Sequence, residues 1–195
     1  MSKFIVVSGP SGVGKGTLIK MLQDKYKELD KKVYLSLSCT TRAPREGEEE
    51  GVAYYFITEE EFLKRVNNGD FLEYNKYGTG KYYGTPKSTA MNYLNDGYDV
   101  ILEIDVNGYK QVKENFPDCI GVFITAPSLD NLRSRLINRG TETMDVIEQR
   151  IETAKEELKQ VDLYDKVIIN YEGEVDKAFK EFYDIISEDW FFLIF

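Results

Sequence analysis

The most specific chemistry in this sequence lies in a glycine-rich segment near its start. The segment Gly9–Thr17 reads Gly-Pro-Ser-Gly-Val-Gly-Lys-Gly-Thr, follows the apolar run Phe4–Val7 and precedes a helical pattern of apolar residues that begins at Leu18. A strand, a glycine loop and a helix in this order form the context of a phosphate-binding loop. Glycines let several backbone N–H groups point at one anion, and the helix start adds a favourable dipole. Lys15 then supplies a full charge for the β- and γ-phosphates of a nucleotide.

The end of this segment departs from the usual motif. The usual motif ends Gly-Lys-Ser/Thr, whereas here Gly16 follows Lys15 and the hydroxyl arrives one residue later, at Thr17. Two roles for Thr17 therefore stay open. It either binds magnesium or holds a phosphate oxygen, with the metal bound mostly through water and phosphates. An ordinary glycine-rich turn is the alternative to a phosphate loop, and the agreement of motif and context disfavours it.

A second candidate anion site lies in the segment Ser38–Gly47, which combines hydroxyl groups with Arg42 and Arg45. Pro44 keeps the chain extended between the two arginines. An arginine fork matches two phosphate oxygens at once, so paired arginines beside hydroxyls suit a phosphate monoester. Taken alone, the segment is equally well interpreted as a solvated basic turn.

Two acids follow a strand that reads as buried. The near-continuous apolar run Asp99–Asp105 is typical of a buried parallel strand and carries Glu103 and Asp105 at its end, where such strands meet a ligand crevice. A carboxylate there can accept from a guanine N1–H and amino group, or hold water around magnesium. The alternative is that Asp105 begins the helix expected after Gly108. We favour the binding role.

Three arginines lie on a predicted helical hairpin. One helix opens at Pro127-Ser128 and carries Arg135 and Arg139, which lie four residues apart and hence on one face. The second helix, at about residues 144–160, carries Arg150. Either these arginines form a solvated face with nearby acids, or the hairpin is a lid that closes over a transferring phosphoryl group.

The remaining patterns complete an alternating α/β chain. Residues 38–85 read as a compact insert of short strands and one helix, which a Thr58–Glu61 capping box starts. Tyr54 and Tyr83 of this insert are either sheet filler or donors to a phosphate. Further elements are predicted as a first helix at about 15–29, a strand with one buried face at Val33, Leu35 and Leu37, a helix with Pro86 at its first position, strands at 119–125 and 166–170, and a last helix at 175–186.

Bulk composition narrows the class. A chain of 195 residues with 42% apolar content fits one domain with a real core. The net charge of −9 argues against general nucleic-acid binding, and the absence of histidine excludes Ser-His-Asp chemistry and histidine-bearing zinc sites. Cys39 and Cys119 lack metal-ligand spacing and are expected to be reduced and structural, as in a cytosolic protein. No signal peptide is expected, and the apolar tail Trp190–Phe195 is too short to span a membrane.

Several motifs in one order give the chain a resemblance to guanylate kinase, the enzyme that transfers a phosphoryl group from ATP to GMP. The resemblance extends from about residue 3 to about residue 187. It rests on the glycine-rich segment and on Thr40-Thr-Arg-Ala-Pro-Arg45, Phe71-Leu-Glu-Tyr74, Tyr82-Tyr-Gly84, Leu102-Glu-Ile-Asp105 and Arg139-Gly-Thr-Glu-Thr143.

The resemblance implies a fold and its subdivision. The fold would be α/β, a P-loop three-layer core with a five-stranded parallel sheet, a small mixed α/β GMP-binding insert and a helical lid. Residues 1–195 would form a single guanylate kinase-like domain. Its core would comprise 1–37, 86–134 and 160–195, its insert 38–85 and its lid 135–159.

The resemblance also implies roles for individual residues. The ATP-binding residues would be Gly9, Pro10, Ser11, Gly12, Val13, Gly14, Lys15, Gly16, Thr17 and Asn170. The GMP-binding residues would be Ser38, Arg42, Arg45, Tyr54, Glu73, Tyr83, Thr85, Glu103 and Asp105. The catalytic residues would be Lys15, Arg135, Arg139 and Arg150. Two departures affect these assignments: the interval from Glu73 to Gly84 is longer than usual, and Glu103 stands where many members have aspartate.

The implied reaction needs no side-chain base, because the GMP phosphate dianion can itself attack the γ-phosphorus of ATP. Products would be ADP and GDP, in purine nucleotide metabolism, and dGMP is also an expected acceptor. Mg²⁺ would accompany ATP, with no direct protein ligand assigned beyond the possibility of Thr17. We expect a cytoplasmic monomer or weak homo-oligomer that binds neither nucleic acid nor membranes. The competing functions are a P-loop kinase for another monophosphate or a phosphorylated ribose, a bare ATPase and an inactive protein-interaction module.

Overall fold

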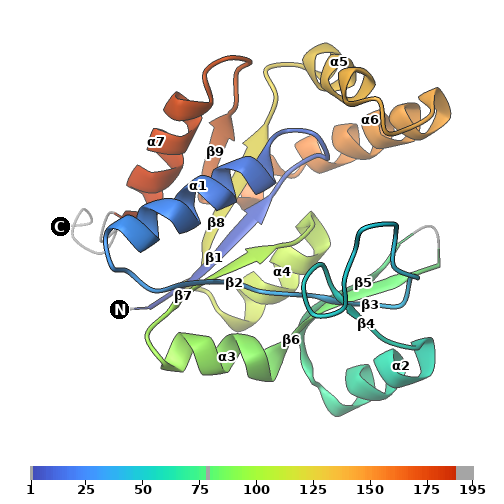
Figure 1. Cartoon of the computed structure of the whole chain (residues 1–195), viewed down its shortest axis with the longest axis vertical. Coiled ribbons are helices and arrows are strands. Elements are labelled where there is room, and N and C mark those ends of the chain that lie inside the picture. The colour runs from blue at the N-terminus through green and yellow to red at the C-terminus, as the bar shows by residue number, and fades with distance from the viewer. Residues whose placement is uncertain (1, 78–79, 188–195) are drawn as a thin grey trace. The chain divides into compact units, whose positions relative to one another are not determined.

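The computed structural model describes residues 2–77 and 80–187, over which helices and strands alternate (Figure 1). The tail Trp190–Phe195, expected to pack on the core or on a neighbouring chain, lies outside the described residues. The elements are β1 (Phe4–Ser8), α1 (Lys15–Glu28), β2 (Val33–Leu35), β3 (Cys39–Thr40), β4 (Tyr55–Phe56), α2 (Glu59–Asn68), β5 (Phe71–Lys76), β6 (Tyr82–Pro86), α3 (Lys87–Asn95), β7 (Asp99–Glu103), α4 (Val106–Asn115), β8 (Ile120–Thr125), α5 (Leu129–Arg139), α6 (Met144–Leu158), η1 (Val161–Leu163), β9 (Lys166–Ile169) and α7 (Val175–Ser187).

The main sheet has five strands in the order β2-β7-β1-β8-β9. β1 lies parallel to β8 with Val6 opposite Gly121, and β8 lies parallel to β9 with Ile124 opposite Ile168. Every residue of β1 is buried, as expected for an apolar strand covered on both faces. The α/β class and the five-stranded parallel sheet predicted from the sequence are confirmed.

Contacts divide the chain into two compact units. The first unit comprises residues 1–4 and 32–119, and the second comprises residues 5–31 and 120–195. The predicted phosphate loop and lid arginines belong to the second unit. The predicted guanine and monophosphate residues all belong to the first.

The second unit packs α1 and α7 side by side (Figure 1). The apolar face of α7 includes the buried Ala178, Phe182 and Ile186, in agreement with the sequence pattern. Helices α5 and α6 form the predicted hairpin, and Ser128 caps α5 by accepting a hydrogen bond from the Asn131 N–H at 3.1 Å.

The first unit contains a smaller sheet with the order β4-β3-β6-β5. Thr58 caps α2 as predicted, because its hydroxyl accepts from the Glu61 N–H, and Gly69 ends the helix in the left-handed region at φ 73°. Phe62 of α2 is buried and stacks on Phe71 of β5 with ring centroids 4.5 Å apart. This aromatic contact holds the helix on the small sheet.

Two predictions for local structure in the first unit were wrong in detail. Pro86 is the N-cap of α3 rather than its first residue, because its ψ of 120° keeps it extended and paired opposite Phe71 in the small sheet. The predicted strand at residues 33–37 ends at Leu35, and its residues are half-buried rather than buried on one face. β2 is the edge strand of the main sheet, which accounts for the incomplete burial.

Cys39 and Cys119 are both buried and free, as the sequence predicted. Burial is the main cause of a rise in the pKa of the Cys39 thiol to about 11, although Arg65 opposes it. A thiol with so high a pKa is almost fully protonated at neutral pH and is a poor nucleophile.

Gly9 and Gly16 provide a matched pair for testing how the glycine-rich segment packs. Gly9 has φ +138°, and an added Cβ would lie 2.0 Å from the carbonyl oxygen of Ile124, whereas a Cβ on Gly16 would meet no heavy atom within 4 Å. We expect Gly9→Ala to reduce the free energy of unfolding by roughly 3 kcal/mol, since backbone cannot move aside. Gly16→Ala should raise it by up to about 1 kcal/mol, because alanine favours a helix. Urea unfolding of both variants is the measurement, and equal midpoints would contradict this packing.

Candidate active site

The glycine-rich segment forms a loop between β1 and α1, as predicted. Gly14 is the N-cap of α1 at φ 96°, a left-handed conformation that glycine adopts readily. Lys15 begins the helix, and its Nζ donates to the carbonyl oxygens of Gly9 at 2.7 Å and Pro10 at 3.1 Å. The ammonium group therefore lies across its own loop, where it can reach a bound anion by side-chain rotation.

Asn170 ties this loop to the neighbouring strand and to a lid arginine. Its Nδ2 donates to the carbonyl oxygen of Val13 at 2.9 Å, and its own carbonyl oxygen accepts from Nη2 of Arg135 at 2.7 Å. An added Cβ on Gly14 would lie 2.6 Å from Asn170 Nδ2, so a side chain there would break this contact. The structure thus brings together the loop and Asn170, which were predicted to bind ATP, and Arg135, which was predicted to be catalytic.

Arg150 also contacts the loop. One of its nitrogens donates to the hydroxyl of Ser11, and another donates to a carboxylate oxygen of Glu142. The second Glu142 oxygen is buried and accepts no hydrogen bond from the described residues. Glu142 therefore holds Arg150 at the loop, a contact that the sequence did not predict, since Glu142 was given no role of its own within the Arg139–Thr143 motif.

Arg139 and Thr17, by contrast, are exposed. Arg139 is the last residue of α5 and forms no ion pair among residues 2–77 and 80–187. The Thr17 hydroxyl lies in the first turn of α1. In the part of the chain that the structure describes, no group of three or more cysteine or acidic side chains is arranged to hold a metal ion.

In the first unit, Arg42 is the centre of a dense polar cluster. Its Nη1 and Nη2 donate to the two carboxylate oxygens of Glu48 at 2.6 and 2.7 Å, and its Nε donates to the Tyr83 hydroxyl at 3.1 Å. The guanidinium carbon lies 5.0 Å from the centre of the Tyr54 ring. Three predicted monophosphate residues, Arg42, Tyr54 and Tyr83, are therefore adjacent.

Glu48 is a site residue that the sequence did not predict. The sequence analysis assigned it no role, yet its carboxylate occupies the fork of Arg42 and also accepts from the Arg45 N–H at 2.9 Å. The hydrogen bond from Arg42, followed by that from Arg45, lowers the pKa of Glu48 from 4.5 to about 2. The same contact raises the pKa of Arg42 above its ordinary value. The fork of Arg42 is thus shaped to bind an oxyanion.

Ser38 and Arg45 lie on either side of Arg42 in the sequence. Arg45 is exposed, and within the described ranges its side chain forms no ion pair. Ser38 is half-buried just before β3. Burial, followed by the neighbouring Tyr83, raises the pKa of the Tyr54 hydroxyl, which therefore remains a hydrogen-bond donor at neutral pH.

Glu73 and Thr85 face each other across β5 and β6. Their backbones are paired in register, and the Thr85 hydroxyl donates to Glu73 Oε1 at 2.7 Å. Glu73 is only 5% exposed, and this burial raises the pKa of its carboxyl group from 4.5 to about 7 despite the hydrogen bond. The carboxyl group can therefore accept or donate a hydrogen bond near neutral pH. The longer interval before Gly84 leaves this predicted pair intact.

Asp105 is the N-cap of α4, which begins at Val106 rather than after Gly108. Its Oδ1 accepts from the Gly108 N–H at 2.8 Å, and its Oδ2 accepts from Asn75 Nδ2 at 2.6 Å. The capping alternative is therefore confirmed as a structural role, and it leaves each oxygen a further lone pair for a ligand. Glu103 is exposed at the end of β7.

Comparison with known proteins decides the family. The guanylate kinase family model matches residues 1–189 of the chain. The chain belongs to the guanylate kinase family. It is 48% identical over 187 residues to the guanylate kinase of Enterococcus faecalis, covering 96% of this chain and 89% of that one. It is 43% identical over 187 residues to the guanylate kinase of Prochlorococcus marinus, covering 96% and 98%.

A solved structure agrees with this assignment. The crystal structure of guanylate kinase from Anaplasma phagocytophilum superimposes with a TM-score of 0.73 at 28% identity, over 95% of this chain and 84% of that one. Membership of the guanylate kinase family makes the chain an enzyme of the nucleoside monophosphate kinase type, and it supports phosphoryl transfer from ATP to GMP. The alternative of an inactive interaction module is not favoured.

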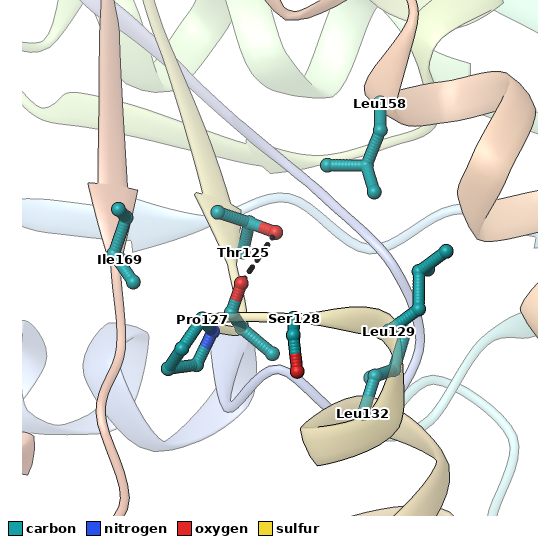
Figure 2. A pocket seen from close by; sticks show the side chains of 8 residues that line it. Thr125, Pro127, Ser128, Leu129, Leu132, Leu158 and Ile169 are labelled. Atoms are coloured by element: carbon teal, nitrogen blue, oxygen red, sulfur yellow. Dashed lines mark hydrogen bonds between the residues drawn. The ribbon is translucent and has the colours of Figure 1, made fainter.

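A separate cavity of 220 Å³ lies in the second unit where β8 ends and α5 begins (Figure 2). The Thr125 hydroxyl donates to the Ala126 carbonyl oxygen there at 3.2 Å. The cavity contains none of the predicted site residues and has no cationic group for a phosphate, so neither substrate is assigned to it. Its lining comprises Thr125, Ala126, Pro127, Ser128, Leu129, Leu132, Leu158 and Ile169.

The raised pKa of Glu73 predicts a specific pH dependence of stability. The folded state holds the Glu73 proton more tightly than the unfolded state, so this stabilisation is complete below pH 4.5 and is lost as the pH rises through about 7. Glu73→Gln should flatten the stability curve over this interval and make the protein more stable than wild type above it. Urea unfolding across the pH range measures the effect.

Glu48→Gln serves as the matched control for this measurement. Since the pKa of Glu48 is lowered from 4.5 to about 2, its stabilisation is present above pH 4.5 and is lost as the pH falls toward 2. Its substitution should therefore leave the slope above pH 4.5 unchanged. Parallel curves for wild type and Glu73→Gln between pH 4.5 and 7 would contradict the burial of an ionisable Glu73.

Proposed function

We propose that the chain transfers the γ-phosphoryl group of ATP to GMP, giving ADP and GDP, with ATP bound by the second unit and GMP by the first. The subdivision implied by the family, a core at 1–37, 86–134 and 160–195, an insert at 38–85 and a lid at 135–159, is part of this proposal. A cytoplasmic location is part of the proposal and is consistent with two buried, free cysteines. No helix among the described residues is long and apolar enough to cross a membrane.

The observation that carries the GMP assignment is the arrangement of β6. Tyr83, at the oxyanion fork of Arg42, and Thr85, at the buried carboxyl of Glu73, lie two residues apart on this strand. Side chains at this spacing point to the same face, separated by about 7 Å along the strand. A monophosphate at one end and a purine at the other therefore match the spacing and chemistry of this face.

The proposed phosphate contacts are Ser38, Arg42, Arg45, Tyr54 and Tyr83. Arg42 supplies a two-pronged donor that already binds a carboxylate, and Arg45 is an exposed cation beside it. A phosphate dianion can replace Glu48 at Arg42 or share the cluster with it, since Arg45 provides further charge. Two phenol hydroxyls complete the set of donors.

The proposed base contacts are Glu73, Thr85 and Asp105, with Glu103 close by. Guanine presents an N1–H and an amino group as donors, and carboxylate oxygens are matching acceptors. Adenine lacks this pattern at the corresponding positions. Leaving a buried carboxylate without a donor is costly, so Glu73 discriminates against adenine as well as attracting guanine.

On the ATP side, the loop of residues 9–17 would hold the phosphates through backbone N–H groups and Lys15. Asn170 would lie near the adenine, and Arg135, Arg139 and Arg150 would neutralise charge on the transferring group. The contacts of Arg135 with Asn170 and of Arg150 with Ser11 support this placement, since both arginines already lie beside the loop.

Catalysis in this proposal is positioning and charge neutralisation. The GMP phosphate oxygen attacks the γ-phosphorus in line, and no side chain is needed to remove a proton. Magnesium would enter with ATP, held mainly by phosphates and water with the Thr17 hydroxyl as the candidate protein ligand, and would neutralise phosphate charge. Because the described residues contain no cluster of carboxylates that could bind the metal directly, binding through phosphates, water and a hydroxyl fits the chain better.

Substitution of the lid arginines tests the catalytic assignment. We expect Arg135→Ala and Arg150→Ala each to lower kcat by roughly 10³-fold, because their charge is needed most in the transition state. The KM for GMP should change much less, since neither residue belongs to the unit that binds it. Steady-state ADP release is the measurement.

Arg133→Ala is the matched control for these variants. Arg133 lies on the same helix as Arg135 but pairs with Glu148, away from the loop contacts. Its loss should leave kcat near the wild-type value. Unchanged turnover in either lid variant would remove that arginine from the chemistry.

A panel of acceptors tests the substrate assignment. Incubation with ATP and magnesium plus GMP, AMP, CMP or UMP should release ADP fastest with GMP. Glu73→Gln, which substitutes a neutral amide for the carboxyl group, should lower kcat/KM for GMP by about tenfold or more and relax discrimination against AMP. Wild-type activity that prefers another monophosphate would refute the GMP assignment. Intact discrimination in Glu73→Gln would refute only the role of Glu73.

A further inference from the structure

Asn75 lies on the strand face that carries the proposed GMP contacts. On β5 it is two residues from Glu73, so both side chains point to one face of the strand. Its partner across the sheet is Tyr83, just as the partner of Glu73 is Thr85. Of these four facing residues, Asn75 is the one to which the sequence assigned no role.

The side chain of Asn75 is committed to Asp105. Its Nδ2 donates to Asp105 Oδ2 at 2.6 Å, while Asp105 Oδ1 accepts from the Gly108 N–H at 2.8 Å. A carboxylate held through both oxygens cannot rotate freely about its terminal bond. Each oxygen still has a second lone pair for a further donor.

The first turn of α4 brings this carboxylate beside Glu73. A Cβ added to Gly108 would lie 2.7 Å from Glu73 Oε2, so the turn capped by Asp105 packs directly against the buried carboxyl group. The two acids are close enough to interact electrostatically. The orientation of Asp105 therefore decides which donors a base beside Glu73 can satisfy.

We propose that Asn75 is a positioning residue for guanine recognition, which fixes the Asp105 carboxylate so that its remaining lone pairs accept from the base. The inference rests on the proposed function, because it requires Asp105 to contact guanine. It predicts that Asn75 contributes to GMP affinity and base selectivity, and not to the phosphoryl-transfer step.

The nearby Gln111 provides a matched control. Its side-chain amide accepts from the Tyr74 N–H at 3.2 Å and donates to the Tyr74 carbonyl oxygen at 2.9 Å, so it also links α4 to β5. Among the described residues it forms no hydrogen bond with Asp105. Loss of Gln111 therefore weakens the same helix–strand contact without releasing the carboxylate.

The experiment compares Asn75→Ala, Asn75→Asp and Gln111→Ala in the full chain. Asn75→Ala should raise the Kd for GMP, measured by calorimetry, and the KM for GMP by roughly tenfold, because a hydrogen bond to a charged group is lost. The kcat, the KM for ATP and the kcat/KM for AMP should stay at wild-type values. Asn75→Asp should weaken GMP binding further, since an ionised aspartate cannot donate and repels Asp105. Gln111→Ala should keep wild-type affinity for GMP.

Several outcomes would overturn the proposal. Equal Kd values for GMP in wild type and Asn75→Ala would do so even if both were catalytically silent, because binding is measured directly. Equal losses for GMP and AMP, or equal losses in Asn75→Ala and Gln111→Ala, would reduce Asn75 to a structural role. A wild-type chain that binds GMP but releases no ADP would refute the proposed reaction. The Kd values for GMP of wild type and Asn75→Ala would still decide the role of Asn75.

Discussion

The carboxyl group of Glu73 is buried, and the protein itself must compensate for the water that this group has lost. Thr85 donates to one oxygen, and the first turn of α4 closes over the other with no room for a side chain at Gly108. Burying a carboxyl group is unfavourable unless it is protonated or hydrogen-bonded. Strands β5 and β6 and helix α4 are therefore held in a fixed arrangement around a single polar group. A group kept under such conditions is ready to receive the donors of a ligand.

In the proposed function the second unit would hold highly charged phosphates. The groups proposed to bind them are backbone N–H groups, a lysine and arginines, all of which keep their charge or dipole across the physiological pH range. The chain has no histidine, so no imidazole titrates near neutrality. The carboxyl group of Glu73, whose pKa is raised to about 7, and the substrate phosphates are then the main sources of pH dependence near pH 7.

Local signals in the sequence predicted most of the fold. These signals are the glycine-rich loop, the apolar strands and the capping residues Thr58 and Ser128. Each acts over a few neighbouring residues, so its effect can be predicted from the linear sequence. Errors arose where sheet position decided the outcome. Pro86 stayed extended because Phe71 pairs with it, and β2 is half-buried because it lies at an edge. Neither fact can be derived from the residues next to it in the chain.

The candidate site, like the fold, was predicted only in part from the sequence. Motifs identified the residues whose type is unusual for scaffold, such as Arg42 and Lys15. They did not identify Glu48, Glu142 or Asn75, because a glutamate in an acidic turn or an asparagine in a strand is common in solvated positions. Only the three-dimensional contacts show that each of these holds another charged group. The division of the chain into two units was likewise not evident from composition.

The ion pair between Arg42 and Glu48 has a consequence for how an anion would arrive. Because the guanidinium already has a counter-ion, its long-range field is largely cancelled, and Arg45 remains to attract a dianion from solution. Entry of a phosphate then becomes an exchange of one oxyanion for another, in which Arg42 stays paired throughout. Ionic strength would weaken such an exchange less than it weakens capture by a bare arginine, since both sides of the equilibrium contain a paired cation.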